Sequence, residues 1–466
     1  FEAGTGLGKT LGYLFPAIKQ SKEQGKCILV SCHTKNLQDQ LFYKDLPILS
    51  SALGISLNAA LLKGRSNYIC KTRFNWLMNE RNKILSSKDI ESILPLIIWL
   101  LYTETGDLSE CSGFWNSRPV KIPSLIKSEK GYCTTSICAK NDGCYFGKIR
   151  RSSQNTELLI INHALLFAEI ENEGILPEHN TVIIDEAHNL VDTAYNQLQK
   201  SINAISIISA IERIDPENKS ASYWRKQLDY IVDRRKSLSN LIIGLHDLVE
   251  RCKIKVNTLF DEIGFNIKSR FNSSSKYVEK YIIYDLKEEY GMFKNEFDLL
   301  KTDIVSIIDV LNNLNMQIKA LEDADSDFSE ILTQIDSFID SLNNILKLIN
   351  DLTQDQNFDW VYWQEGIFRS EENFELVIYG CPIDISKNLV EEFFKKVEYC
   401  ILTSATLRVN DSFKYYFSRT GLDSFDIDNV ISGVFESPFY YEDQVNYFQY
   451  VGRDGQDPGL HANIIY

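Results

Sequence analysis

The sequence lacks an apolar run that could cross a membrane. The longest one, ILPLIIWLLY at residues 93–102, is far shorter than the roughly 20 residues that a membrane-spanning helix needs. No secretory leader is visible, and ten cysteines in such a chain do not suggest disulfides. We therefore expect a cytoplasmic globular protein that does not engage membranes. Its 466 residues, 44% of them hydrophobic, suffice for about three domains of the usual size.

Positive charge is scarce overall but not everywhere. The net charge is −15, yet residues 1–200 carry 22 Lys and Arg against 20 Asp and Glu, a balance of +2, which leaves 27 against 44, or −17, for the rest. The clearest basic stretch, residues 63–88, interleaves Tyr68, Phe74 and Trp76 with seven basic residues. These are Lys63, Arg65, Lys71, Arg73, Arg81, Lys83 and Lys88. Cations suit phosphates and flat rings suit unpaired bases, so the stretch is consistent with a single-stranded DNA site. A solvated basic helix over a small core fits it equally well.

A glycine-rich loop opens the chain. Its eight residues are Ala3, Gly4, Thr5, Gly6, Leu7, Gly8, Lys9 and Thr10. They fit the phosphate-binding P-loop pattern, except that Ala3 stands where the first glycine is usual. In such a loop the backbone N–H groups surround a phosphate chain and the following helix points its positive end at the same charge. Lys9 is then expected to reach the β- and γ-phosphates of ATP, and the Thr10 hydroxyl to ligate Mg²⁺.

The flanks of the loop favour this interpretation over a simple glycine-rich turn that caps a helix. Leu11, Leu14, Phe15 and Ile18 continue with helical spacing, and CILVSC at residues 27–32 has the composition of a buried strand. A helix followed by a strand in this order predicts an α/β fold.

A second motif, TVIIDEAHNL, lies at residues 181–190. Its apolar residues predict a buried parallel strand, with Asp185 and Glu186 at its carboxyl end, where open α/β sheets bind their ligands. Asp185 can hold Mg²⁺, and Glu186 can orient or deprotonate an attacking water. An Asp-Glu-Ala-His tetrad after a P-loop is rare by chance, and His188 is then available to relay the nucleotide state.

A third strand-like run, YCILTSATL at residues 399–407, ends in small hydroxyl residues. Thr403, Ser404 and Thr406 could hydrogen-bond across to His188. Alone this is an ordinary strand end, but after the other two motifs it predicts a segment that couples the nucleotide site to the rest of a motor.

Three cysteines stand apart from the rest. Cys133, Cys138 and Cys144 lie in a polar, glycine-containing stretch with four and five residues between them, which predicts a loop folded around a metal centre. A fourth thiolate is needed, and Cys70 and Cys111 both precede the three. Spacing decides neither between these two cysteines nor between zinc and an iron-sulfur cluster.

Two apolar heptad runs mark the long segment at residues 200–365. The first consists of Leu300, Ile304, Ile307, Leu311, Leu314, Ile318 and Leu321. The second consists of Phe328, Ile331, Ile335, Phe338, Leu342, Ile345, Ile349 and Leu352. The polar sequence EDADSD at 322–327 separates them, and so short a turn predicts an antiparallel hairpin whose two seams bury each other. A dimerising coiled coil is the alternative.

In this order the motifs resemble those of the iron-sulfur DNA helicases of superfamily 2, the XPD and DinG group, and DinG most closely. The resemblance is carried by EAGTGLGKT (2–10), SCHTKNLQDQL (31–41), KGRSNYIC (63–70), INHALL (161–166), DEAH (185–188), WVYW (360–363), PIDIS (382–386), TSATL (403–407) and SPFYYEDQ (437–444). It implies an α/β P-loop NTPase (RecA-like) motor domain with an inserted iron-sulfur cluster domain and an inserted α-helical arch domain. The implied activity is that of a monomeric, ATP-driven helicase. Such an enzyme moves 5′ to 3′ along single-stranded DNA, opens forked DNA, and serves repair or replication.

The resemblance also selects among the cysteines. The first ligand of the family follows a GR-NY-C pattern, which matches Cys70, so that Cys70, Cys133, Cys138 and Cys144 are expected to hold a [4Fe-4S] cluster and Cys111 to be a bystander. The implied domains are motor domain 1 at 1–64, 153–199 and 366–434, the cluster domain at 65–152, the arch at 200–365, and the beginning of motor domain 2 at 435–466.

The resemblance further implies that some family segments lie outside the printed sequence. These are the strand before the P-loop and an adenine-contacting segment, expected before residue 1, and later motifs with arginines that reach the γ-phosphate. An SMC- or Rad50-like ATPase that tethers DNA also joins a P-loop to a coiled-coil hairpin. In that class the coiled coil precedes the acidic strand, whereas here DEAH comes first and no Leu-Ser-Gly-Gly stretch occurs, which favours the helicase interpretation.

Overall fold

The computed structural model describes residues 1–4, 6–129, 144–171, 176–218, 222–271, 278–321, 328–368 and 374–436. Parts of the sequence-based expectations lie outside the described residues, namely Thr5, Cys133, Cys138, the turn at 322–327 and the SPFYYEDQ motif at 437–444. Within the described residues, no helix is both long and apolar enough to span a membrane.

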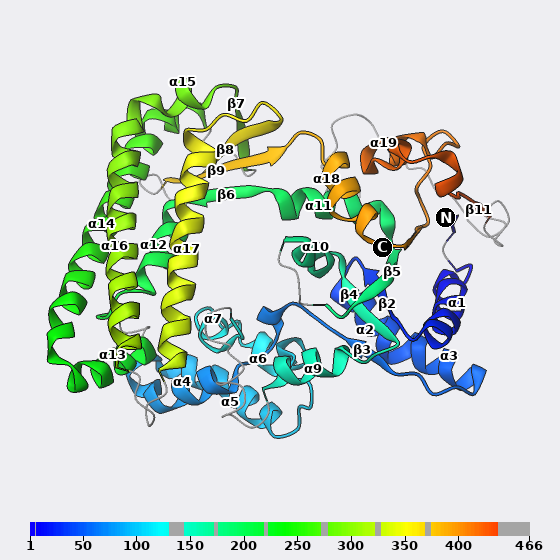
Figure 1. Ribbon diagram of the computed structural model, residues 1–466, viewed down its shortest axis with the longest axis horizontal. Helices are drawn as coiled ribbons and strands as arrows, with labels where there is room; N and C mark the ends of the chain where they lie inside the picture. The colour runs from blue at the N-terminus through cyan, green and yellow to red at the C-terminus, as the bar shows by residue number, and fades with distance from the viewer. Residues whose placement is uncertain are drawn as a thin grey trace, which may run out of the picture.

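Five parallel strands form the central sheet (Figure 1). In spatial order they are β10 (Tyr399–Thr403), β5 (His179–Asp185), β2 (Cys27–Cys32), β4 (Leu158–Asn162) and β3 (Ala59–Leu61). Runs of Leu, Ile and Val suit such strands because both faces of a parallel sheet are covered. The strand expected at 27–32 and the strand expected to end at Asp185 are both present. The α/β fold with a parallel sheet is therefore confirmed.

Alternate residues of these strands enter two separate cores. Ile28 and Val30 of β2 pack on one face with α1 (Lys9–Gln24) and α3 (Leu46–Leu53). Leu29, between them, faces the opposite core. The helices of that second core are α10 (His163–Glu171), α11 (Leu190–Leu198), α18 (Ser386–Glu392) and α19 (Lys414–Thr420). The sheet thus has helices on both faces and aligns the carboxyl ends of its strands along one edge.

A short strand precedes the P-loop. β1 (Glu2–Ala3) pairs in parallel with β11 (Val434–Phe435), and Glu2 also forms a bridge with Ser404 just after β10. The expectation that the strand before the loop lies wholly before residue 1 is therefore corrected, because a two-residue strand at Glu2–Ala3 precedes the loop. The bridge places the loop directly beside the TSATL segment.

The segment expected to hold the cluster, for which we keep the name cluster domain, is a small helical unit inserted between β3 and β4. Its helices are α4 (Lys71–Ile84), α5 (Ser87–Leu100), α6 (Ser112–Asn116), α7 (Ile122–Ile126) and α9 (Tyr145–Ser153). Leu77, Leu96 and Phe114 are fully buried at its centre. The basic α4 lies over this core. This is the arrangement expected if residues 63–88 form a solvated basic helix over a small core.

The arch is the larger insertion. Its helices are α12 (Ala204–Glu212), α13 (Ser222–Arg234), α14 (Ser239–Ile267), α15 (Leu286–Tyr290), α16 (Lys294–Lys319) and α17 (Ser329–Thr353). Its antiparallel sheet has the strand order β6 (Lys200–Asn203), β9 (Phe374–Pro382), β8 (Trp360–Phe368) and β7 (Glu279–Ile283). The sequence analysis foresaw neither this sheet nor the 29-residue α14. The boundary expected at residue 365 falls within β8, and the pairing of β8 with β9 moves the end of the arch beyond Pro382.

The predicted hairpin of α16 and α17 is present. All the heptad residues of both runs are buried except Leu321, which is partly buried. Asn315 Nδ2 donates to Asp336 Oδ1 over 2.7 Å, while Lys301 Nζ donates to Asn350 Oδ1 over 3.0 Å, so the helices run antiparallel. Because α14 packs on the same core, the seams are covered within one chain and need no second copy.

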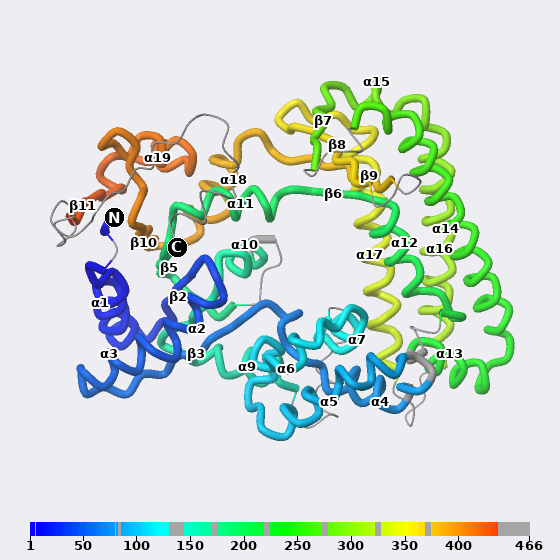
Figure 2. Tube along the Cα trace, turned by 180° about the vertical axis from the view of Figure 1, so that it is seen from behind, coloured from blue at the N-terminus to red at the C-terminus, as the bar shows by residue number. Residues whose placement is uncertain are grey.

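The domains are arranged in a closed circuit, visible from both sides in Figures 1 and 2. The long arch helices lie at the end opposite α1 and α3, with the arch sheet along one side and the cluster domain along the other. The circuit is closed at the Glu129 carboxylate. Its Oε2 accepts a hydrogen bond from Arg73 of the cluster domain over 2.8 Å and forms an ion pair with Arg213 of the arch. We refer to this contact as the Glu129 joint.

Candidate functional site

The P-loop leads directly into α1. Gly6 and Gly8 have φ angles of 79° and 86°, in the left-handed region that glycine adopts without strain. Gly8 is the N-cap of α1, and Lys9 and Thr10 are its first residues. The backbone N–H groups at the start of α1 have no helical partner of their own, which makes this end a place for an anion.

The two carboxylates of the DEAH motif stand opposite this helix. Lys9 Nζ lies 3.3 Å from Glu186 Oε1, and the backbone N–H of Glu186 donates to Asp185 Oδ1 over 3.0 Å. Glu186 has a φ of 54°, a left-handed conformation that is uncommon for a residue other than glycine and is a recurrent feature of functional sites. The structure thus brings together the lysine and both carboxylates that the sequence proposed.

Tyr13 also belongs to this site, although the sequence analysis did not select it. Its hydroxyl donates to Asp185 Oδ2 over 3.0 Å and lies within hydrogen-bonding reach of Thr10. Burial, followed by the charge of Asp185, raises the pKa of Tyr13 well above its usual value. Burial also raises the pKa of Asp185, although the hydrogen bond from Tyr13 opposes that effect. Tyr13 lies four residues after Lys9, one helical turn on, and that spacing could have identified it.

His188 connects the DEAH motif to the TSATL segment. Its Nδ1 lies 2.6 Å from Ser404 Oγ and 3.3 Å from Glu186 Oε2. The Thr406 N–H donates to the same Ser404 oxygen over 3.3 Å. Thr403 pairs with Asp185 in the register of β10 and β5. The contact between His188 and Ser404 has the geometry that the sequence analysis expected, whereas no hydrogen bond of a Thr403 or Thr406 side chain to His188 is found among the described residues.

A cavity of about 350 Å³ adjoins the loop and is lined by Leu7, Lys9, Tyr13 and Thr403 among others.

Glu2 is a second residue that the sequence analysis missed. Its carboxylate accepts hydrogen bonds from the Arg408 side chain at 2.8 Å and from the backbone N–H groups of Leu407 and Arg408 at 2.7 Å. It therefore ties the start of the P-loop to the end of TSATL.

Comparisons with known proteins agree with this site. A family model described as DEAD_2 matches residues 111–207. The ATP-dependent DNA helicase YoaA of Haemophilus influenzae is 26% identical over 449 residues, or 95% of this chain and 61% of the relative. The 3'-5' exonuclease DinG of Bacillus subtilis is 25% identical over 459 residues, or 95% of this chain and 47% of the relative. The chain is therefore similar to YoaA and DinG proteins over nearly its whole length.

The chain spans about half to three fifths of the length of the curated relatives it matches. The YoaA helicase of Escherichia coli gives the same result as its Haemophilus counterpart, with 26% identity over 95% of this chain and 61% of the relative. The solved structure of S. tokodaii Xpd4 overlaps 88% of this chain and 56% of that one, with 14% identity and a TM-score of 0.34. A superposition that weak does not establish a shared fold.

Two of the four cysteines proposed for the cluster are described. Cys70 immediately precedes α4 and Cys144 immediately precedes α9, both partly exposed. The residues after them are in contact, because the Lys71 ammonium lies 4.6 Å from the centre of the Tyr145 ring. The Gly147 N–H donates to Cys144 Sγ over 3.3 Å. Cys70 and Cys144 therefore lie at the starts of two neighbouring helices.

Cys111 differs from these two. It lies in the apolar core of the cluster domain with only 4% of its surface exposed. Burial raises the pKa of its thiol, which disfavours the thiolate that metal binding needs. This environment is consistent with its expected role as a bystander.

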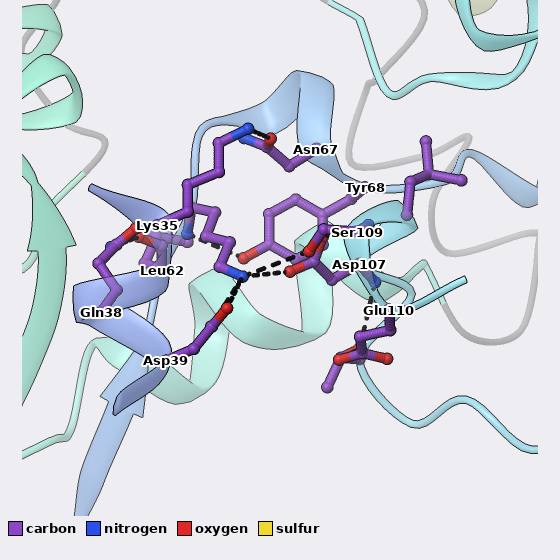
Figure 3. Close-up of polar contacts among 12 residues, drawn as sticks. Lys35, Gln38, Asp39, Leu62, Asn67, Tyr68, Asp107, Ser109 and Glu110 are labelled. Atoms are coloured by element: carbon purple, nitrogen blue, oxygen red, sulfur yellow. Dashed lines mark hydrogen bonds and ion pairs between the residues drawn. The ribbon is translucent and has the colours of Figure 1, made fainter. Parts of the chain in front are cut away.

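The structure corrects the proposed DNA interface at Lys63. Its side chain is 4% exposed, and its ammonium lies 2.6 Å from Asp107 Oδ2 and 2.8 Å from Asp39 Oδ1 (Figure 3). Lys63 follows β3 of the motor domain, Asp39 belongs to α2 (Lys35–Gln40), and Asp107 belongs to the cluster domain. Lys63 is thus an internal ion at the junction of two domains. A sequence shows its charge but not the two carboxylates that fold back onto it.

The other basic residues of the stretch differ in their environments. Arg73 is engaged with Glu129 and with the Lys127 carbonyl. Arg65 lies over the Phe146 ring, 5.1 Å from its centre. Arg81 and Lys88 are exposed on the surface of the cluster domain. Arg81 and Lys88 thus present their side chains to solvent, whereas Lys63 and Arg73 are engaged in ion pairs within the protein.

Proposed function

We propose that this DinG-like protein is an ATP-dependent helicase that moves 5′ to 3′ along single-stranded DNA and opens forks during DNA repair or replication. The observation that carries the proposal is the approach of Lys9, at the start of the P-loop helix, to Asp185 and Glu186 at the end of a central parallel strand. This is where an open α/β sheet binds a nucleotide.

The chain's own residues have distinct tasks in ATP hydrolysis. Lys9 and the N–H groups after Gly8 would bind the β- and γ-phosphates, so Lys9 would exchange its present contact with Glu186 for the nucleotide. Thr10 and Asp185 would hold Mg²⁺, which neutralises charge on the phosphates. Glu186, released from Lys9, would orient the attacking water. His188 would report the state of the site through Ser404, since it contacts both Glu186 and Ser404.

We propose further that Cys70, Cys133, Cys138 and Cys144 hold a [4Fe-4S] cluster in the cluster domain. The neighbouring positions of Cys70 and Cys144 support the site, and the buried Cys111 is the natural control. Protein purified without oxygen should be brown and contain iron and acid-labile sulfide. Cys138→Ser should remove the colour and loosen the domain, because the binding energy of a metal centre is also folding energy, whereas Cys111→Ser should keep the colour. Zinc without sulfide would overturn this assignment.

The proposed partners are single-stranded and forked DNA, with a monomer as the working unit in the cytoplasm. The intramolecular packing of α16 and α17 supports a monomer, because it leaves no open heptad seam for a second copy. The SMC- or Rad50-like alternative is not favoured. In that class the hairpin lies, along the sequence, between the P-loop and the acidic strand of the nucleotide site. Here β5, which carries the acidic residues, precedes the hairpin.

The test measures ATP turnover with and without single-stranded DNA, and unwinding of a fluorescent fork with a 5′ tail. The chain as printed should bind single-stranded DNA with an affinity that falls steeply with salt. Unwinding is to be compared between this chain and a form extended to the length of the YoaA and DinG relatives. The extended form should unwind the fork in the presence of ATP, because translocation requires two motor domains that alternate their grip. Failure of the extended form to hydrolyse ATP with DNA would refute the proposed function.

A further inference from the structure

A buried histidine lies behind the DEAH motif. His163, from INHALL at residues 161–166, begins α10 directly after β4, and its side chain is fully buried. Its neighbour Asn162 caps the helix by accepting the Leu165 N–H over 3.0 Å. The cap accounts for the asparagine at position 162. It does not account for a polar imidazole at position 163, where an apolar side chain would pack equally well. Burial lowers the pKa of His163 to about 4, so the ring is neutral at physiological pH.

The two nitrogens of this ring have different neighbours. Nδ1 lies 2.7 Å from the hydroxyl of Ser31, which is itself fully buried near the end of β2. The backbone of Asp185 and Glu186 lies close enough to the ring to favour its protonated form. Nevertheless Nε2 makes no hydrogen bond of ordinary geometry within the described part of the chain. The ring therefore lies between β2, to which Nδ1 is bonded, and the turn that carries the two carboxylates, whose backbone it approaches without a hydrogen bond of ordinary geometry among the described residues.

An unsatisfied polar atom in a buried place is costly and needs an explanation. The adjacent turn provides one, because Glu186 is in a left-handed conformation that a residue other than glycine keeps only while its surroundings hold it. At present Lys9 and His188 both contact its carboxylate. A bound nucleotide would draw Lys9 away, and a small relaxation of the turn would bring a backbone carbonyl within reach of Nε2.

We propose that His163 is a positioning residue that couples the DEAH turn to β2: Nδ1 stays bonded to Ser31, and Nε2–H donates to the turn backbone in only one nucleotide state. The inference deepens the proposed function and rests on it. It adds a second histidine–serine pair to that of His188 and Ser404, on the opposite side of the same turn.

The route continues from Ser31 to the cluster domain. β2 ends one residue later, and Thr34 begins α2 by accepting the Leu37 N–H over 3.3 Å. That helix carries Asp39, which pairs with Lys63, and Lys35, which donates to Asn67 over 2.5 Å (Figure 3). A displacement at the turn is thereby passed through His163, Ser31 and α2 to the junction of the motor and cluster domains.

The experiment compares three variants of the extended, DNA-stimulated protein. His163→Asn keeps an amide near the position of Nδ1, His163→Gln keeps one near Nε2, and Ser31→Ala removes the partner with the smallest change of volume. His179→Gln is the matched control, because His179 lies at the other end of β5, where its Nδ1 is 2.9 Å from the Pro177 carbonyl oxygen. The readouts are nucleotide affinity, basal ATP turnover, turnover with single-stranded DNA, and the melting temperature.

We expect each of the three variants to lower the ratio of DNA-stimulated to basal turnover about five- to tenfold, the effect of one lost hydrogen bond. Nucleotide affinity and basal turnover should stay within about twofold. Ser31→Ala combined with His163→Gln should be no worse than the more affected single variant, because both interrupt one relay. A purely structural histidine would lower the melting temperature and leave the ratio unchanged, which would overturn the inference. If the unaltered protein shows no stimulation by DNA, the proposed function fails instead.

Discussion

Replacing Lys63 by methionine removes the ammonium between Asp39 and Asp107 while keeping most of the side-chain volume. The effect on stability follows from the burial of each partner. Asp107 is 6% exposed in its side chain and loses its counter-ion in the interior, a change that typically costs about 3–5 kcal/mol. It keeps two other donors, the Ser109 N–H at 2.9 Å and the Ser109 hydroxyl at 2.8 Å. Because these donors remain, we expect a cost near or somewhat below the lower end of that range, about 2–4 kcal/mol.

Asp39 provides a graded comparison. Its side chain is 38% exposed, so water can replace the ammonium, and Asp39→Asn should cost less than about 1 kcal/mol. Lys26→Met, at an exposed lysine of the motor domain, controls for the loss of one surface charge. The loss in free energy of unfolding should therefore be largest by far for Lys63→Met, smaller for Asp39→Asn, and smallest for Lys26→Met.

Urea unfolding followed by tryptophan fluorescence is a suitable assay. The cluster domain contains Trp76, Trp99 and Trp115, which pack at or around its core. With a slope of roughly 2–3 kcal/mol per molar urea, the expected loss lowers the transition midpoint by about 1 M. If Lys63 instead contacts DNA, Lys63→Met will leave the midpoint unchanged and reduce the salt dependence of DNA binding, and our assignment of Lys63 to the domain junction will be wrong.

The same series has a pH signature. Burial opposes the charge of Lys63, but its hydrogen bonds and ion pairs with Asp107 and Asp39 outweigh burial and raise its pKa. A lysine whose pKa is raised on folding contributes stability fully below its unfolded pKa of about 10.5, and this contribution is lost as the pH rises through the folded value. The difference between the unaltered protein and Lys63→Met should therefore be constant near neutral pH and shrink only in strong alkali.

Two other changes have definite outcomes. Lys9→Ala should weaken both ATP binding and turnover, whereas Glu186→Gln should spare binding and stop hydrolysis; equal loss of binding in the two, measured with a fluorescent nucleotide, would contradict their roles. In the arch, the His246 Nδ1 atom lies 2.8 Å from Asp215 Oδ1, and this hydrogen bond raises the pKa of His246. That stabilisation is complete below about pH 6.5 and is lost as the pH rises through the raised value, so His246→Gln should flatten the decline of the urea midpoint above about pH 6.5. An identical decline in both proteins would show that the pair contributes nothing.

The extent to which the sequence predicts this structure depends on how local each signal is. The strands at 27–32 and ending at Asp185 are predictable because an apolar run between polar residues has few alternatives in an α/β chain. Which side of α1 is buried is less predictable from the sequence. Leu11 and Phe15 are about half exposed, whereas Tyr13 is buried beside Asp185. Hydrophobicity favoured the leucine and phenylalanine, but the position of the sheet edge decided which side of the helix is covered.

The arch and the domain junction show the limit of such reasoning. The apolar seams of α16 and α17 repeat every three or four residues, so the sequence predicts them. In contrast, β6 consists of only Lys200–Asn203 and pairs with a strand more than 170 residues later. Short strands in distant pairings leave little periodicity to detect. The burial of Lys63 likewise depends on Asp107, 44 residues away, and nothing next to the lysine indicates that partner.

The Glu129 joint has a mechanical consequence. The cluster domain and the arch leave the central sheet at different strands, and Arg213 of the arch contacts Glu129 of the cluster domain in an ion pair. Each insertion is therefore held at two places, where it leaves the sheet and at this joint. While Arg213 stays on Glu129, a rotation of the arch is transmitted to the cluster domain. The two side chains are 44% and 35% exposed, and an ion pair of that kind contributes only about 0–1 kcal/mol, so the joint should open and reclose at little cost in free energy.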